Sequence, residues 1–176
     1  EISAVFKNQP GIMKGDAIMI YTVERRYFVN NEGTEVVQNL PYARIMVFGE
    51  TKADDGMELP LNLSYFAYDP ADLPANDKII ADAKEMVKTL EALRVAPVVD
   101  PYTGPALLSG PASGVFFHEI FGHRIEGHRL KGGGETFKKK VGELVLPADF
   151  QVYCDPTLRS YAGAELNGFY LYDDQG

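Results

Sequence analysis

The sequence predicts a mixed α/β fold of the α+β type, in which a mostly antiparallel mixed sheet is joined by two main helices. Three observations lead to this fold class. Segments before residue 69 are rich in β-branched and aromatic residues and are separated by turn signals. Residues 76–94 carry apolar side chains at helical spacing. A second helix, beginning at Pro111 or Ser113, is expected to carry every histidine of the chain.

The first 68 residues contain four segments with the composition of strands. They are Asp16–Val23, Arg26–Asn30, Tyr42–Glu50 and Met57–Tyr68. Turn signals at Asn31-Glu-Gly33 and Asp54-Asp-Gly56 separate them into pairs. In the last segment every second residue is apolar or aromatic, which is the period of two expected of a half-buried strand. The residues expected to face the core are Leu59, Leu61, Leu63 and Tyr65. An antiparallel sheet is the simplest interpretation.

A long amphipathic helix is expected next, capped by Asn76 or Asp77 and running to about Arg94. Its apolar stripe is interpreted as core and consists of Ile79, Ile80, Ala83, Met86, Val87, Leu90 and Leu93. Prolines at positions 97, 101 and 105 then interrupt regular structure, which places a boundary near residue 97. We expect a sheet-and-helix part at 1–96 and a motif-bearing part at 97–176, with strands near 149–154 and 167–173.

The motif-bearing part holds the pattern H-E-x-x-x-H at His118, Glu119 and His123. Imidazole nitrogens bind zinc readily, and a nearby carboxylate can take a proton from water, so the histidines are candidate ligands and Glu119 the candidate general base. A regular α-helix would turn His123 roughly 140° away from His118. The metal hypothesis therefore requires a π-bulge or kink between them, and Gly122 is a candidate position for it.

Other interpretations of this region stay open. On an undistorted helix, Glu119, His123 and Glu126 would share a polar face opposite an apolar stripe, with no metal involved. Glu126 is either a carboxylate that orients a ligand imidazole or a surface group paired with Arg129 or Lys131. Cys154 and His128 are weak candidates for a third ligand, Cys154 being more typical of a small buried residue in a strand. The chain contains three histidines, at positions 118, 123 and 128.

The motifs around the histidines resemble the TldD/PmbA family of zinc peptidases. The resemblance rests on Pro101-Tyr-Thr-Gly-Pro-Ala-Leu-Leu-Ser109 and on His118-Glu-Ile-Phe-Gly-His-Arg-Ile-Glu-Gly-His128. It continues through Thr136-Phe137, Asp155-Pro-Thr-Leu158 and Gly168–Gly176, and an earlier landmark lies at Tyr27–Thr34. It is strong over residues 97–176 and weak before them.

The resemblance implies a zinc metallopeptidase that acts on peptides or unfolded proteins, as a homodimer or with a partner subunit that lacks the motif. It also implies a third ligand, a cysteine near the end of a longer chain, so this sequence is expected to be a fragment. The alternative is a non-catalytic structural or partner-binding module whose histidines hold no catalytic metal.

Composition limits the other possibilities. A formal net charge of −8 argues against a broad nucleic-acid-binding surface. The basic run Lys138–Lys140 follows Gly132–Gly134 but lacks the spacing of a phosphate-binding loop, so a flexible solvated loop is the preferred interpretation. Because it directly follows the proposed catalytic helix, this glycine-rich segment is also suited to move over bound substrate. No apolar run approaches the length of a membrane span. One cysteine fits a reducing compartment, so a cytoplasmic protein is expected.

Overall fold

The computed structural model describes residues 1–131, 140–166 and 169–172. The chain forms two compact units, one of Glu1–Val99 with Pro156–Gly176 and the other of Asp100–Asp155. The first unit holds a three-stranded antiparallel sheet and helix α1 (Asn76–Arg94), and the second holds helix α2 (Gly110–Phe117). The predicted α+β class with two main helices is confirmed, whereas the boundary near residue 97 stays a prediction.

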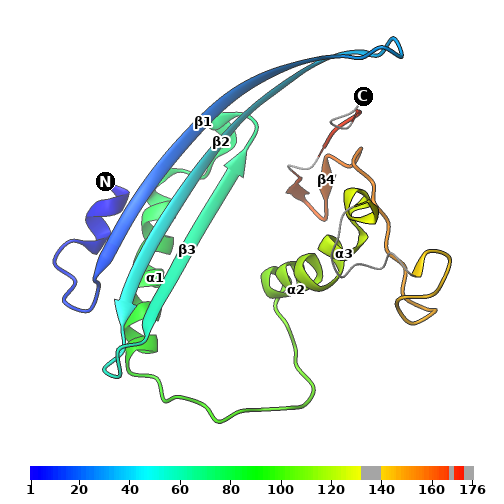
Figure 1. Cartoon of the computed structure of the whole chain (residues 1–176). Helices are drawn as coiled ribbons and strands as arrows, with labels where there is room; N and C mark the ends of the chain where they lie inside the picture. Colours follow the sequence, from blue (N-terminus) through cyan, green and yellow to red (C-terminus); the bar gives the residue numbers. More distant parts are fainter. Residues whose placement is uncertain (132–139, 167–168, 173–176) are drawn as a thin grey trace. The chain divides into compact units, whose positions relative to one another are not determined.

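The sheet consists of β1 (Lys14–Val29), β2 (Glu35–Lys52) and β3 (Glu58–Ala67) in that order (Figure 1). Both predicted turns are present, with positive φ angles at Gly33 and Gly56 that favour glycine. The two strands predicted at 16–30 are one continuous strand, and β2 begins seven positions before the predicted Tyr42. These corrections have one cause, because the ladder between β1 and β2 continues without a break to the pair Val29 and Glu35.

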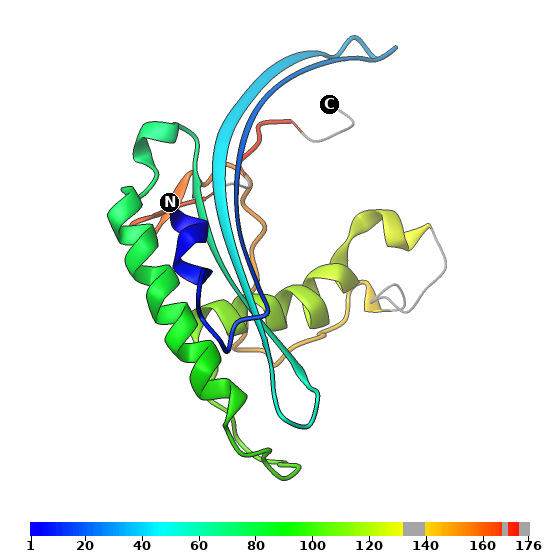
Figure 2. The same ribbon diagram turned by 90° about the vertical axis from the view of Figure 1, so that its left-hand side faces the viewer.

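Helix α1 and the short helix η1 (Ile2–Phe6) cover one face of this sheet (Figure 2). Alternate residues of β2 face the helix, and Ala43 and Val47 are completely buried there. Val47 and Ile45 belong to the same core cluster as the apolar stripe of α1, of which Ile79, Ala83, Met86, Val87 and Leu90 are buried. The predicted core stripe is therefore confirmed except at Leu93, whose side chain is exposed, and Ile80, which is only half-buried.

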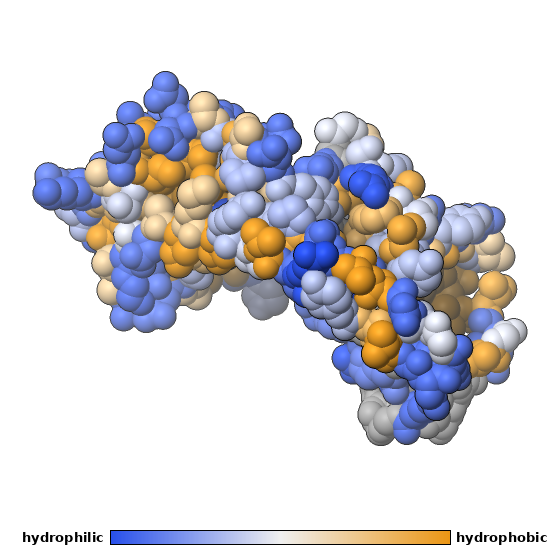
Figure 3. All heavy atoms as spheres, turned by 90° about the horizontal axis from the view of Figure 1, so that it is seen from above, coloured by the Kyte–Doolittle hydropathy of each residue, from blue (hydrophilic) through white to orange (hydrophobic). Residues whose placement is uncertain are grey.

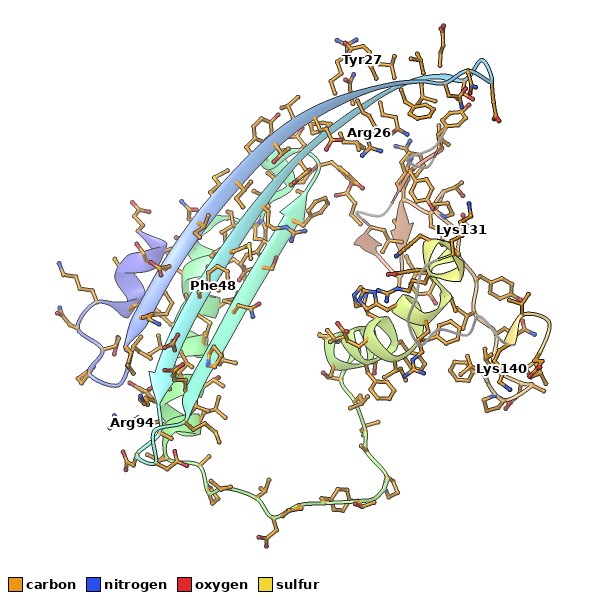
Figure 4. The ribbon with its side chains drawn as sticks, viewed as in Figure 1. Arg26, Tyr27, Phe48, Arg94, Lys131 and Lys140 are labelled. Carbon is orange, nitrogen blue, oxygen red and sulfur yellow. The ribbon has the colours of Figure 1, made fainter. Side chains whose placement is uncertain are left out.

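Both ends of α1 differ in detail from the prediction. The residue that precedes the first turn is Ala75, so Asn76 and Asp77 lie inside the helix instead of capping it. At the other end Arg94 forms an ion pair of 3.7 Å with Asp54 in the turn between β2 and β3 (Figure 4). A short helix η2 (Pro70–Asp72) connects β3 to α1 and is capped by the side chain of Asp69, which accepts from the Ala71 N–H.

The segment after residue 155 returns to the sheet of the first unit. It forms a short hairpin of β4 (Ser160–Tyr161) and β5 (Ala164–Glu165). The hydroxyl of Tyr68 donates to the Leu166 carbonyl at 2.8 Å, and the amide of Gln38 donates to the Tyr172 carbonyl at 3.3 Å. These long-range hydrogen bonds explain why residues 156–176 group with the sheet.

The predicted strand at 149–154 is wrong, because these residues pair with no strand in the described part of the chain. Of the strand predicted at 167–173, residues 169–172 are irregular, and the other positions lie outside the described residues. Patterns of alternating residues predict a strand only when a neighbouring strand is available to pair with it. Here β4 and β5 pair with each other instead.

Hydrophobic side chains also remain at the surface, as the orange spheres of Figure 3 show for one face. In the second unit Val115 is 63% exposed and Phe116 46% exposed, although both lie in α2. Among the helices of the described residues, none combines the length and the apolar character needed to cross a membrane.

Candidate metal centre

The candidate site lies on a helix whose hydrogen-bonding pattern changes at His118. Helix α2 begins after Ser109, with Pro111 in its first turn as predicted, while Ser113 lies inside it. It is followed by a π-helical segment η3 (His118–Gly122), by α3 (His123–Ile125) and by a short helix η4 (Gly127–Leu130). The N–H of His123 donates to the carbonyl of His118, five residues earlier, which is the hydrogen bond that defines a π turn.

The π turn brings the two histidines together. Their ring centroids lie 4.5 Å apart with the planes inclined at 73°. The carboxylate of Glu119 lies between them, 3.9 Å from Nε2 of His118 and 3.9 Å from Nε2 of His123. One possible ligand atom from each of the three residues lies within 4.8 Å of the others. The distortion that the sequence required between the histidines is thus confirmed, and the three residues could hold a metal ion.

Gly122 contributes less to this distortion than its position suggested. Its φ and ψ angles are −50° and −55°, which any residue adopts in a right-handed helix. A Cβ atom at this position would lie 3.7 Å from the Phe117 carbonyl oxygen, an ordinary contact. The π turn therefore does not depend on a conformation that only glycine can reach.

Glu126 connects the site to the helix that follows. Its Oε1 lies 2.6 Å from Nδ1 of His123, and its Oε2 accepts from Nε of Arg129 at 2.5 Å. The hydrogen bond from Arg129, followed by that from His123, lowers the pKa of Glu126 to about 2. Glu126 is therefore ionised at neutral pH and only accepts hydrogen bonds. Glu126 therefore contacts both a histidine and Arg129, whereas its role in orienting a metal ligand stays a prediction.

Neither weak candidate for the third ligand joins this group in the described part of the chain. His128 is exposed, and its Nε2 lies 3.6 Å from Oε2 of Glu126. Cys154 is exposed and lies in no strand, so the expectation of a buried residue in a strand was wrong.

Several other sequence features of this half of the chain lie outside the described residues. They are the glycine-rich loop, Thr136-Phe137, the first two lysines of the basic run, and residues 168 and 173–176 of the last family landmark. The third lysine, Lys140, is described and forms an ion pair of 2.8 Å with Glu143 (Figure 4).

Comparison with known proteins gives one result. Residues 101–176 match the family model described as the PmbA/TldA metallopeptidase C-terminal domain. No curated protein and no solved structure matches the chain. The matched region includes the π turn with both of its histidines, and it is the region in which the sequence resembles the same proteins. Residues 101–176 are therefore similar to the C-terminal domain of the PmbA/TldA metallopeptidases.

Proposed function

We propose that this chain is part of a zinc-dependent metallopeptidase that hydrolyses peptide bonds in peptides or unfolded proteins. His118 and His123 are the proposed ligands, and Glu119 is the proposed general base. One observation carries the proposal: a π turn brings together two histidines that a regular helix would separate, and one possible ligand atom from each of them and from Glu119 lies within 4.8 Å of the others. The match of residues 101–176 to a metallopeptidase family model supports the same chemistry.

The donor set fits zinc. Zinc binds imidazole nitrogen at roughly 2 Å, so two ligand nitrogens lie roughly 3 to 4 Å apart. The possible ligand atoms of the three residues lie within 4.8 Å of one another, which is close to this spacing. Both Nε2 atoms face the carboxylate of Glu119 at 3.9 Å and are therefore directed toward one region. When bound, zinc would act as a Lewis acid that polarises the scissile carbonyl and makes a water molecule more acidic.

Glu119 has the exposure and the position that a general base needs. Its side chain is 61% exposed, and within the described residues it accepts no hydrogen bond from another side chain. Its oxygens are therefore available to take a proton from the attacking water and to return it to the leaving amine. Glu126, by contrast, has both of its oxygens engaged and is unsuited to this role.

The proposal includes a third protein ligand, because catalytic zinc sites commonly use three. The proposed third ligand is the cysteine that the family resemblance implies. We further propose that the enzyme is cytoplasmic and works as a homodimer or with a partner subunit that lacks the motif. Nucleic acid and membranes are not among its proposed partners.

The first experiment is to measure zinc per chain in the wild type, His123→Ala and Glu119→Gln, with Glu143→Gln as a control. Glu143 is also an exposed carboxylate of the second unit, but its partner is Lys140. Near-stoichiometric zinc in the wild type and in Glu143→Gln, lost in His123→Ala, is the expected result.

Cleavage of a denatured, fluorescently labelled protein then tests the catalytic role in the full-length enzyme. Glu119→Gln is expected to keep its zinc and to lose cleavage. Loss of zinc in this variant would make Glu119 a ligand instead of a base. Absence of zinc from the wild type, with stability unaffected by His123→Ala, would favour the non-catalytic module.

A further inference from the structure

We propose that Glu126, held by Arg129, is a positioning residue that fixes the ring of His123 with its Nε2 free for the metal. The inference rests on the proposed metal site and extends it to two residues that would not touch the metal or the substrate. On this proposal the two histidines differ: the ring of His123 is held in a fixed orientation before the metal binds, whereas that of His118 is not.

The geometry that carries this proposal is a chain of two short contacts. Glu126 lies three residues after His123, and Arg129 lies three residues after Glu126. Glu126 itself has φ −59° and ψ 122° and stands at the break between α3 and η4. The contacts measure 2.6 Å from Nδ1 of His123 to Oε1 of Glu126 and 2.5 Å from Nε of Arg129 to Oε2. The side chains of the three residues are 38%, 33% and 39% exposed, so this chain of contacts is half-buried.

The chemistry of the contact determines the tautomer of His123. An ionised carboxylate only accepts hydrogen bonds, so the ring hydrogen of neutral His123 lies on Nδ1 and points to Glu126. Nε2 then carries the lone pair, and it is the nitrogen that faces Glu119. Carboxylates that hold the second ring nitrogen of a ligand histidine raise its basicity and fix its orientation.

His118 has no equivalent support in the part of the chain that the structure describes. Its ring contacts are with Glu119, at 3.9 Å from Nε2, and with the ring of His123. Its side chain is 63% exposed, against 38% for His123. His128 also lies close to Glu126, with its Nε2 3.6 Å from Oε2 of the carboxylate. This is the oxygen that accepts the hydrogen bond from Arg129, so Oε1 remains for His123. Glu126 thus supports one ligand of the pair.

The first test uses the metal-free protein, so it does not depend on zinc binding. Nitrogen-15 NMR of the full chain at neutral pH reports which ring nitrogen of each histidine carries the hydrogen. We expect neutral His123 to carry it on Nδ1 in the wild type and in Glu143→Gln. In Glu126→Gln the amide oxygen accepts from Arg129, which turns the amide NH2 group toward Nδ1, so the hydrogen should move to Nε2. Equal tautomer populations for His123 in the wild type and Glu126→Gln would overturn the proposal.

The second test measures zinc affinity by competition with a chromophoric chelator. Because loss of such an outer partner costs about 10- to 100-fold in metal affinity, we expect a loss of that size in Glu126→Gln. Arg129→Gln should give a smaller loss of the same sign, since Glu126 keeps its charge but loses its anchor. Affinities within twofold of the wild type for Glu126→Gln would refute the positioning role. If the wild type binds no zinc, the proposed function fails, while the tautomer measurement still decides whether Glu126 orients His123.

Discussion

Removing one residue from the π turn tests the reasoning behind the metal site most directly. Deletion of Ile120 shortens H-E-x-x-x-H to H-E-x-x-H, in which the histidines lie four positions apart. A π turn is equivalent to one extra residue in an α-helix, so the deletion should leave a regular helix with both histidines on one face. We expect the deletion variant to retain zinc.

The magnitude follows from helix geometry. On a regular α-helix, residues five apart are separated by about 140° and a rise of about 7.5 Å, which puts side-chain ends at a radius of about 5 Å roughly 12 Å apart. The observed separation of the ring centroids is 4.5 Å. Residues four apart differ by only about 40°. The spacing of four and the π-distorted spacing of five are therefore the two arrangements that bring the histidines together.

The assay compares the deletion with an insertion of one alanine after Phe121. The insertion makes the spacing six, which on a regular helix directs the histidines about 120° apart, and it should abolish zinc binding. Far-ultraviolet circular dichroism controls for loss of the helix, and chelator competition measures zinc affinity. A folded deletion variant that loses zinc while the wild type binds it would refute the reasoning, and so would an insertion variant with wild-type affinity.

Three further predictions concern the first unit. Leu90 is completely buried, so Leu90→Ala should lower the free energy of unfolding by about 2–5 kcal/mol in urea titrations, and a loss below 1 kcal/mol would contradict the core assignment. A Cβ at Gly15 would overlap the ring of Phe6, so Gly15→Ala should cost about 1–3 kcal/mol in the same assay, unlike alanine at the open position Gly110. Burial, followed by the hydrogen bond to Asp82, raises the pKa of Tyr65 from 10.0 to about 12, so its contribution to stability should be complete below pH 10 and lost as pH rises toward 12. Unfolding measured from pH 8 to 12 should show a smaller alkaline loss in Tyr65→Phe, and identical profiles would contradict this.

Asp82, the partner of Tyr65, should have the opposite pH dependence: its contribution to stability is lost at low pH instead of high pH. Hydrogen bonds from Lys78, then from Tyr65, lower the pKa of Asp82 below its ordinary 3.8. A carboxyl group with a lowered pKa in the folded state contributes stability above about pH 4 and loses it as the pH falls through the lowered value. The hydrogen bond from Tyr65 to Asp82 is 2.8 Å long and needs a protonated Tyr65 and an ionised Asp82. It therefore stabilises the contact between β3 and α1 mainly at pH values between the pKa of Asp82 and that of Tyr65.

The sequence by itself determined the features that depend on near neighbours. Helix α1, its core stripe and the alternation along β3 follow from residue periodicities that the structure preserves. The three residues of the candidate site lie within six positions of one another, so helix geometry alone showed that they could meet only through a distortion. That the distortion is a π turn, however, was one of two alternatives.

Tertiary structure decided the features that depend on distant partners. Glu35–Leu40 is a strand because β1 continues beside it, and the segment after residue 155 returns to the sheet through hydrogen bonds that span 98 and 134 positions. Cys154 lies in no strand because the described chain offers its segment no partner. Glu126 had several possible partners along the helix, and the fold gives it His123 and Arg129 together. Pairings of this kind arise from three-dimensional proximity, for which a single sequence carries no local signal.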